Sequence, residues 1–407
     1  MSRPKKSIDD LALFGGAPAF AENLYVGRPN VGDRTRLMQR IEGILDRRWV
    51  TNNGPLVQEL ERRLTSYLGV KHCIVTCNAT IALEIVIRAA GLTGEVIVPS
   101  FTFVATAHAL QWQGITPVFA DIDPATHCLD PRKVDMMITP RTTGIIGVHV
   151  WGQPCYIEAL SDIARRHGLK LLFDAAHAFG CTNRGRMIGG FGDAEVFSFH
   201  ATKFFNTLEG GAVTTSSDEL AEKVRLMKNF GFAGFDNVVS IGTNGKMNEV
   251  SAAMGLTSLE SINEFIAANR ANHELYREHL AGVPGLRVLT YDGAEKNNFQ
   301  YVVVEIEEAV AGISRDAVVR ALRAERVIAR RYFYPGCHRM EPYRSLMPRA
   351  GLLLPETERL CTRVMVLPNG TTLSAEHVRA VCAILRLLVE HGASVSERAA
   401  YAVAKGV

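Results

Sequence analysis

The sequence predicts an α/β protein in which a large domain, built on a mostly parallel central sheet, is followed by a smaller C-terminal α+β domain. Between residues 71 and 216, short continuous apolar runs alternate with amphipathic helical patterns. Strands of this kind are typical of a sheet that is covered by helices on both faces. Beyond Gly285 this alternation ends, and a chain of 407 residues is long enough for two domains.

The elements of the large domain can be assigned in chain order. Asp33 precedes an apolar helical stripe and can cap a helix, and Pro55 stands at the first position of a second helix. Strands are then predicted at residues 72–76, 95–99, 117–121, 144–150, 170–174, 194–199 and 211–215. Helices are expected between several of them, for example at 156–167, where apolar residues recur at helical spacing.

A long helical pattern from residue 246 to about 280 leads the chain out of the large domain. The smaller domain is then predicted to contain strands at 299–306 and 327–330 and helices at 315–325 and 375–389. We therefore expect an N-terminal arm (residues 1–30), a large domain (31–260), a small domain (261–392) and a tail (393–407) that is frayed or loosely docked.

The composition indicates a globular protein of the cytoplasm. A net charge of +3 is too small to indicate a nucleic-acid or membrane partner, and no apolar run approaches the ~20 residues of a membrane span. The first ten residues are polar and lack the apolar stretch of a signal peptide. Cys73 and Cys77 are close, but no further Cys or His completes a metal site, so we expect no metal and free thiols in a reducing compartment.

Lys203 is the most informative residue. It ends the run Phe-Ser-Phe-His-Ala-Thr-Lys, and Asp174 stands 29 residues earlier at the end of an apolar run. A strand-end carboxylate and a lysine in the loop after a second strand are the groups needed to hold pyridoxal phosphate (PLP). The lysine forms a Schiff base with the cofactor aldehyde, and the Asp keeps the pyridine nitrogen protonated, so that the ring can accept electrons. A lone lysine would be a solvated surface charge; the pair indicates PLP.

Two positions could bind the cofactor phosphate. Asn78, Ala79 and Thr80 follow the first strand and open a helix, whose N-terminus offers free N–H groups and the positive end of the helix dipole. The same residues are also typical of a simple helix cap. Ser198, five residues before Lys203, could reach the same phosphate, or it could be an ordinary buried serine of a strand.

Two ring-bearing residues could contact the cofactor ring. Phe103 comes just after a strand end and could stack on the pyridine, although a single Phe is more often part of the core. His177, three residues after Asp174, could contact the phenolic oxygen of the cofactor or could cap a helix. The polar loop at 242–249, considered alone, is a helix N-cap with Asn248 or Thr243 as the capping residue.

Taken together, these runs resemble nucleotide-sugar aminotransferases of the DegT/DnrJ/StrS type, which have the aspartate aminotransferase fold (PLP-dependent transferase fold type I). The resemblance extends from about residue 30 to 388 and is most specific at 197–211 and 174–177. It implies that Lys203 is the Schiff-base lysine, Asp174 the pyridine partner, His177 the contact to the ring oxygen, Phe103 the stacking ring, and Ala79, Thr80 and Ser198 the phosphate ligands. Asn244 would reach that phosphate from a second subunit, which implies a homodimer with shared active sites.

Within this family, the chain is similar to members that aminate carbon 4 of dTDP-4-keto-6-deoxy-D-glucose with L-glutamate as the amino donor. The similar stretches are residues 13–16, 26–30, 76–80, 230–232 and 332–338. Candidates for binding the sugar or its diphosphate are Lys246, Arg330, Arg331, Tyr334 and His338. The two adjacent arginines are also typical of surface ion pairs. The sequence Cys77-Asn78-Ala79-Thr80 departs from the Ser-Gly-Thr of many relatives.

Three other functions remain as alternatives. One is amination at carbon 3 of a nucleotide sugar within the same family. Another is a non-enzymatic regulator that keeps the PLP fold, against which the presence of Lys203, Asp174 and Ser198 argues. The third is an NAD-dependent sugar oxidoreductase, but the glycines at 189–192 precede a strand instead of linking a strand to a helix, as a dinucleotide site requires.

Overall fold

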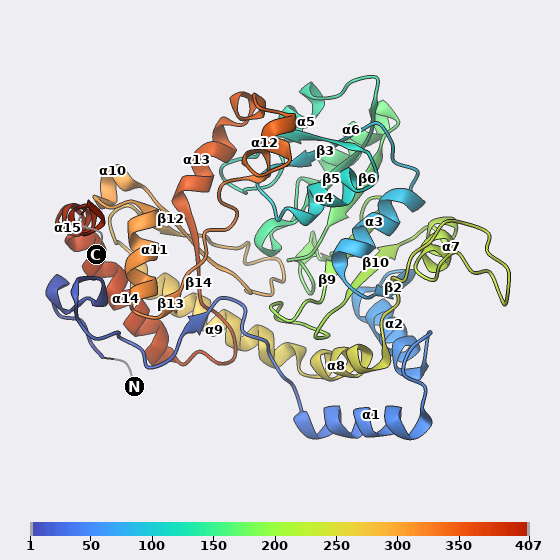
Figure 1. Ribbon diagram of the computed structural model, residues 1–407, viewed down its shortest axis with the longest axis horizontal. Coiled ribbons are helices and arrows are strands. Elements are labelled where there is room, and N and C mark those ends of the chain that lie inside the picture. Colours follow the sequence, from blue (N-terminus) through green and yellow to red (C-terminus); the bar gives the residue numbers. More distant parts are fainter. Residues whose placement is uncertain (1–2, 405–407) are drawn as a thin grey trace.

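The computed structural model describes residues 3–404, and within them seven strands form one large sheet in the order β2-β10-β9-β6-β5-β3-β4 (Figure 1). The strands are β2 His72–Thr76, β3 Glu95–Pro99, β4 Thr116–Ala120, β5 Thr142–Val148, β6 Lys170–Asp174, β9 Ala194–Ser198 and β10 Gly211–Thr215. All neighbours are parallel except β10, which runs antiparallel to both β2 and β9. The mostly parallel α/β class predicted from the sequence is confirmed.

Helices cover both faces of this sheet. One core contains Ile97 of β3 with apolar residues of α2 Pro55–Leu68, α6 Ile157–His167 and α8 Glu249–Glu260. The other contains Val96 and Val98 of the same strand with residues of α3 Ala79–Ala89, α4 Ala105–Gln111 and α7 Asp218–Met227. Because successive side chains of a strand point to opposite faces, one continuous apolar run fills both cores.

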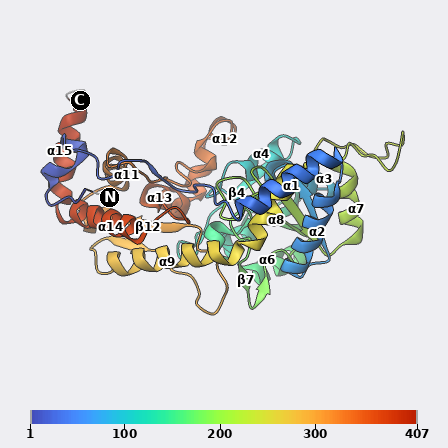
Figure 2. The ribbon, with the colours of Figure 1, turned by 90° about the horizontal axis from the view of Figure 1, so that it is seen from below.

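The start of the large domain follows the expected caps. Asp33 caps α1 Arg34–Arg47, and its carboxylate accepts from the N–H groups of Thr35 and Arg36. Helix α1 packs on α8 at the outside of the domain (Figures 1 and 2). The single long helix expected from 246 to 280 is wrong. The chain forms α8, capped by Asn248, and then α9 Ile262–Leu280. The break lies at Ser261, where the segment at Gly32 crosses so closely that a Cβ there would lie 2.7 Å from Oγ of Ser261.

The smaller part is built on an antiparallel sheet of β11 Leu286–Val288, β12 Val302–Ile306 and β14 Val364–Leu367. Helices α9, α11 Arg315–Ala324 and α14 Ala375–Glu390 pack around it. The strand predicted at 299–306 begins only at Val302, because Phe299 has a positive φ of 50°. The start of the expected loose tail is ordered differently, because residues 392–404 form the helix α15 Gly392–Ala404, in which Val395 is fully buried.

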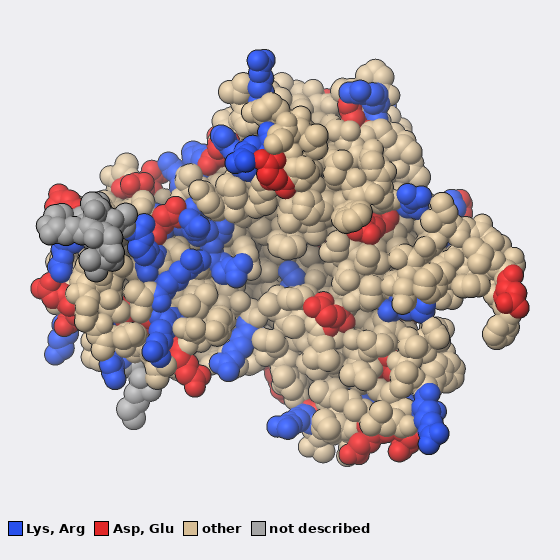
Figure 3. Space-filling view, in the orientation of Figure 1, with Lys and Arg blue, Asp and Glu red and all other residues tan. Residues whose placement is uncertain are grey.

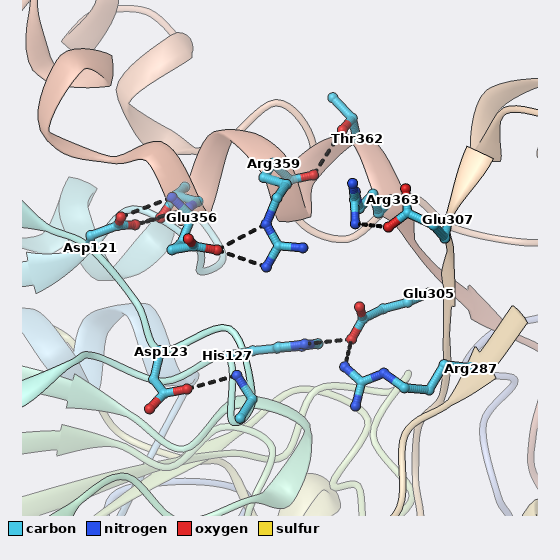
Figure 4. Close-up of polar contacts among 12 residues, drawn as sticks. Asp121, Asp123, His127, Arg287, Glu305, Glu307, Glu356, Arg359, Thr362 and Arg363 are labelled. Carbon is cyan, nitrogen blue, oxygen red and sulfur yellow. Dashed lines mark hydrogen bonds and ion pairs between the residues drawn. The ribbon is translucent and has the colours of Figure 1, made fainter. Parts of the chain in front are cut away.

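Polar contacts join the two parts (Figure 4). The carboxylate of Asp121, just after β4, accepts from the N–H groups of Glu356 and Thr357, each at 2.9 Å, at the start of α13 Pro355–Arg363. A carboxylate is favourable there because the N-terminus of a helix carries partial positive charge. Nε2 of His127 lies 3.0 Å from Glu305 of β12, which also pairs with Arg287.

The N-terminal arm crosses from the small part to the large one (Figures 1 and 2). The buried carboxylate of Glu325 accepts from the N–H groups of Ala12 and Ala19, each at 2.6 Å, and lies 3.1 Å from Nζ of Lys5. Further on, β1 Leu24–Tyr25 pairs in parallel with β13 Val327–Ile328. The arm is therefore fixed to the small part over most of its length.

The remaining elements are short. They are η1 Ile8–Asp10, η2 Ala12–Phe14, α5 Pro131–Met136, η3 Val150–Gly152, β7 Thr182–Asn183, β8 Arg186–Met187, α10 Glu308–Ala311, η4 Cys337–Arg339, α12 Tyr343–Leu346 and η5 Ala350–Leu353. Among residues 3–404, no helix is both long enough and apolar enough to cross a bilayer. Nor does any group of three or more His, Cys, Asp or Glu side chains in this part of the chain have the arrangement of a metal site.

Candidate active site

Asp174 ends β6 in the middle of the large sheet, and its carboxylate is buried. Oδ1 accepts from the N–H of Ala176 at 3.0 Å, and Oδ2 accepts from the hydroxyl of Thr106 at 2.8 Å. Burial raises the pKa of Asp174, and these two hydrogen bonds and the positive charge of Lys203 oppose that rise. A cation placed beside this carboxylate would favour its ionised form further, as the pyridinium nitrogen of PLP would do.

Lys203 lies in the loop that connects β9 to β10. Its Nζ lies 3.3 Å from the hydroxyl of Tyr301, which comes from the small part of the molecule. Burial lowers the pKa of Lys203 to about 8, while attraction by Asp174 acts in the opposite direction. Near neutral pH, a lysine with this pKa is neutral much more often than a surface lysine and can act as a nucleophile or a base.

The lysine loop is held by neighbours on several sides. The side-chain amide of Asn206 donates to the backbone O of Asn30, and that of Asn30 donates to the O of Phe204, both at 2.9 Å. The hydroxyl of Ser258, in α8, donates to the O of Asn206 at 2.9 Å. These buried hydrogen bonds fix the loop and therefore the position of the Lys203 amine.

His177 lies among aromatic rings beside Lys203. Its ring centroid is 4.5 Å from that of Tyr301, and it stacks on Trp151 and Phe333 at 5.9 Å from each. Nδ1 of His177 accepts from the N–H of Trp151 at 3.2 Å. Burial holds the pKa of His177 well below its usual value, so the neutral ring carries its proton on Nε2, which can donate to an anionic oxygen.

The first turn of α3 forms an anion cradle next to β10. Asn78 caps the helix by accepting from the N–H of Ile81 at 2.8 Å, which leaves the N–H groups of Ala79 and Thr80 without a protein acceptor among the described residues. A Cβ at Gly211 would lie 2.7 Å from N of Ala79, so only glycine lets β10 lie this close. Ser198 pairs with Gly211 across the sheet. This arrangement fits a phosphate group.

Two other predicted residues lie at the surface. Phe103 is 59% exposed, just before α4. Asn244 is exposed, and its carbonyl oxygen lies 3.9 Å from Sγ of Cys77 in the same chain, next to the α3 cradle. Its predicted contribution to a second subunit stays a prediction.

The substrate candidates lie in different surroundings. Nζ of Lys246 lies over the ring of Phe230 at 4.4 Å, and the guanidinium of Arg330 lies over Tyr332 at 5.1 Å. Arg331 pairs with Asp316 at 3.1 Å and lies over the half-exposed Tyr334 at 4.6 Å. These contacts leave Lys246 and Arg330 free to meet a ligand, while Arg331 already has an ionic partner.

His338 is the exception among these candidates. It is buried, with Nδ1 at 2.6 Å from the hydroxyl of Ser100 and Nε2 at 2.7 Å from Glu358. Because both ring nitrogens are engaged within the protein, this histidine has no polar atom to offer a sugar, and its place among the substrate ligands is corrected to a structural one.

Sequence reasoning missed three residues of the site, namely Tyr301, Trp151 and Thr106. Tyr301 and Trp151 stand in apolar surroundings and resemble core residues in the sequence. Thr106 lies in the expected stretch after the second strand of the large domain, but its partner Asp174 is 68 residues away. The sequence signal was weak: Thr106 is a hydroxyl residue at the start of a short helix that also contains His108 and Gln111.

Comparison with known proteins agrees with this geometry. The chain is 38% identical over 363 residues to the dTDP-4-amino-4,6-dideoxy-D-glucose transaminase of Shigella dysenteriae, covering 89% of this chain and 98% of the relative. It is also 38% identical over 308 residues to the GDP-perosamine synthase of Caulobacter vibrioides, covering 74% and 82%. The crystal structure of DesI in the presence of its TDP-sugar product matches with a TM-score of 0.93 and 53% identity, covering 96% of this chain and 99% of that one.

The chain also matches a protein family over most of its length. It spans residues 32–386, which include the seven-stranded and the three-stranded sheet and the site residues Asp174, His177 and Lys203. The chain therefore belongs to the DegT/DnrJ/EryC1/StrS aminotransferase family, and its cofactor is PLP.

Proposed function

We propose that this protein transfers the amino group of L-glutamate to carbon 4 of dTDP-4-keto-6-deoxy-D-glucose and so forms dTDP-4-amino-4,6-dideoxy-D-glucose. The observation that carries the chemistry is the partly buried amine of Lys203, with a pKa lowered to about 8, in the same site as the buried carboxylate of Asp174. The choice of sugar is supported by the printed activity of the Shigella dysenteriae relative and by the TDP-sugar product of DesI.

The residues of the site have chemically suitable partners in the cofactor. PLP, when bound, supplies an aldehyde for amines and a ring that delocalises negative charge from the adjacent carbon. We assign Lys203 to the aldehyde and Asp174 to the pyridine nitrogen, while Nε2–H of His177 donates to the ring oxygen. The N–H groups of Ala79 and Thr80 and the hydroxyls of Thr80 and Ser198 bind the phosphate, and Phe103 covers the ring.

When the amino group of the donor takes the place of Lys203 on the aldehyde, the freed lysine amine can move protons. Nζ in its neutral form takes the proton from the α-carbon of the donor and returns one to carbon 4 of the sugar product. The hydroxyl of Tyr301, 3.3 Å away, accepts a hydrogen bond from the charged amine and so orients it between these two positions. The buried rings of Trp151 and Phe333 keep water away from this side of the amine.

We further propose a cytoplasmic homodimer with shared sites. Large apolar side chains are exposed on α1 and after it, at Leu45 and Trp49, and on the segment 230–241, at Phe235 and Ile241. Apolar surface of this extent is typical of a face that another chain covers. Such a face near the exposed Asn244 supports its contribution to the partner's phosphate site. All eight cysteines are free thiols, as is usual in a reducing compartment.

The test is the structure of the product. Purified protein, PLP and L-glutamate are incubated with dTDP-4-keto-6-deoxy-D-glucose, and the product is examined by NMR. We expect an amino group at carbon 4, formed together with one equivalent of 2-oxoglutarate, and no product with Lys203→Ala. An amino group at carbon 3, observed with the 3-keto isomer instead, would establish the alternative regiochemistry. Absence of any amination with both sugars would contradict the proposal.

A further inference from the structure

An open groove of about 860 Å³ lies between the N-terminal arm and the loop of the catalytic lysine. Its walls include Tyr25 and Arg28 of the arm, Thr202 of the lysine loop, and Arg326 and Arg330, which flank β13. In the space-filling view, Lys and Arg side chains gather on the small-domain side of the hollow between the two parts of the molecule (Figure 3). The groove therefore extends from a cationic surface to Thr202, the residue next to Lys203.

The pairing of β1 with β13 brings two arginines to this groove. The strands are parallel, with Leu24 opposite Val327 and Tyr25 opposite Ile328. Both chains continue in the same direction beyond this pair, so Arg28 and Arg330 emerge at the same end of the ladder. Gly27 then meets the lysine loop so closely, with a φ of 75°, that a Cβ would lie 2.7 Å from the backbone O of Thr202.

The groove carries an excess of positive charge. Arg28 and Arg330 are exposed, and within residues 3–404 neither forms an ion pair. Arg326 is instead occupied by the backbone O of Ala21. Glu22 is the acidic residue of the lining. Two unpaired guanidinium groups beside one groove attract a ligand with two or more negative charges.

A row of side chains also connects the groove to the amine of Lys203. The guanidinium of Arg330 lies over Tyr332 at 5.1 Å, and Tyr332 packs edge-on against Tyr301 at 6.4 Å. Tyr301 in turn bonds to Nζ of Lys203. A ligand whose anionic part lies at Arg330 therefore extends its other end past two rings to the catalytic amine.

We propose that this groove binds the diphosphate of the nucleotide-linked sugar, with Arg28 of the arm and Arg330 after β13 as its two cationic ligands. The sugar then extends along Tyr332 toward Lys203, and the nucleoside lies along the arm near Tyr25. This assignment rests on the proposed function, and it gives the N-terminal arm a direct part in substrate binding.

Calorimetric titration of the PLP-loaded protein with dTDP and with thymidine tests the groove without turnover. Arg28→Gln and Arg330→Gln should each weaken dTDP binding about tenfold or more, since a hydrogen bond to a charged group is lost, and should leave thymidine binding unchanged. Arg330→Lys, which keeps the charge, should recover part of the loss. Arg320→Gln, which removes an exposed arginine of α11 outside the groove, is the matched control and should bind dTDP normally.

The two arginine variants should also raise KM for the keto sugar with little change in kcat, because the diphosphate does not react. Three results would contradict the proposed diphosphate site. They are no dTDP binding by the unmodified protein, normal dTDP binding by both arginine variants, or a loss of dTDP binding in Lys246→Gln but not in the arginine variants. The proposed function is judged separately by the product. If the unmodified enzyme aminates the sugar while the two variants bind dTDP as Arg320→Gln does, the proposed function is supported and the diphosphate site is rejected.

Discussion

The hydroxyl of Tyr301 lies 3.3 Å from the amine nitrogen of Lys203, and the ring of Tyr301 also packs against His177 with its centroid 4.5 Å away. Tyr301 directly precedes β12 of the small sheet, whereas Lys203 and His177 belong to loops of the large one. The site is therefore complete only when the two parts of the molecule are docked, and the position of the lysine depends on a residue 98 positions away.

Replacing Tyr301 with Phe keeps the ring packing but removes the partner of the amine. We expect kcat to fall about tenfold, because a hydrogen bond that orients a proton carrier is lost, while KM for the sugar changes little. The kinetic isotope effect with α-deuterated glutamate should increase as proton transfer becomes more limiting. Tyr276→Phe is the control, because its buried hydroxyl lies in the core of the small part and has no hydrogen-bond partner among residues 3–404. An unchanged isotope effect together with an unchanged kcat would exclude this role.

The titration of Lys203 should respond to Asp174 in a defined direction. Attraction by Asp174 raises the pKa of Lys203, which burial has lowered to about 8, so Asp174→Asn should lower it further. The neutral amine is the form that attaches PLP. The rate of PLP attachment to the apo protein, followed by absorbance, should therefore rise with pH with a midpoint near 8 in the unmodified protein and at lower pH in the variant. A midpoint that moves upward would contradict this electrostatic link.

The same shift makes the stability of the apo protein depend on pH. Because the pKa of Lys203 is about 8 when folded and near 10.5 when unfolded, the unfolded chain binds more protons between these values, and stability rises with pH across this window. Lys203→Met removes this dependence. The variant should gain stability over the unmodified protein below pH 8, on the order of 3 kcal/mol, and the gain should shrink toward pH 10.5. Denaturant unfolding at several pH values measures it, and a gain independent of pH would argue against a buried charge.

Subunit mixing tests the shared site. Lys203→Ala lacks the amine, and Asn244→Ala lacks the amide that we assign to the phosphate of the partner subunit. The second change should weaken PLP retention about tenfold or more. In mixed dimers, one of the two sites contains both residues intact, so at a PLP concentration too low to load Asn244→Ala, combining the two proteins should restore activity. Mixed dimers that form but remain inactive, or an active monomer, would show that each chain builds its own site.

Much of the large sheet could be predicted from the sequence. The strands at 72–76, 95–99, 170–174 and 211–215 agree to the residue, because continuous apolar runs there end at turn-forming or polar residues. The break at Ser261 was not predicted, because the residues around it have no Gly or Pro and the close crossing of the segment at Gly32 is visible only in the structure. The tail helix α15 was missed for a similar reason, because Val395 is buried only by packing on the small core.

Some residues of the candidate site could likewise be predicted from the sequence, and others could not. Lys203 and Asp174 belong to local patterns that indicate chemistry by themselves, and the structure brings both into one buried site. Tyr301 stands in an apolar run with no distinguishing neighbours, and Arg28, although it lies in the similar stretch 26–30, shows in the sequence no sign that it lies near Arg330. His338 was misplaced because a histidine in a run of candidate residues does not reveal that Ser100 and Glu358 already occupy its ring. Contacts of this kind depend on tertiary packing.

The N-terminal arm works as a strap between the two parts of the enzyme. It is anchored at one end by Glu325 with Lys5 and by the β1–β13 pair, and at the other by Asn30 on the lysine loop. A segment fastened at both ends limits how far the small part can swing away from the large sheet. Any such swing would pull on the loop that carries Lys203, so movement of the small part and alignment of the amine are mechanically coupled. A change near residue 5 could thus alter catalysis without touching the substrate.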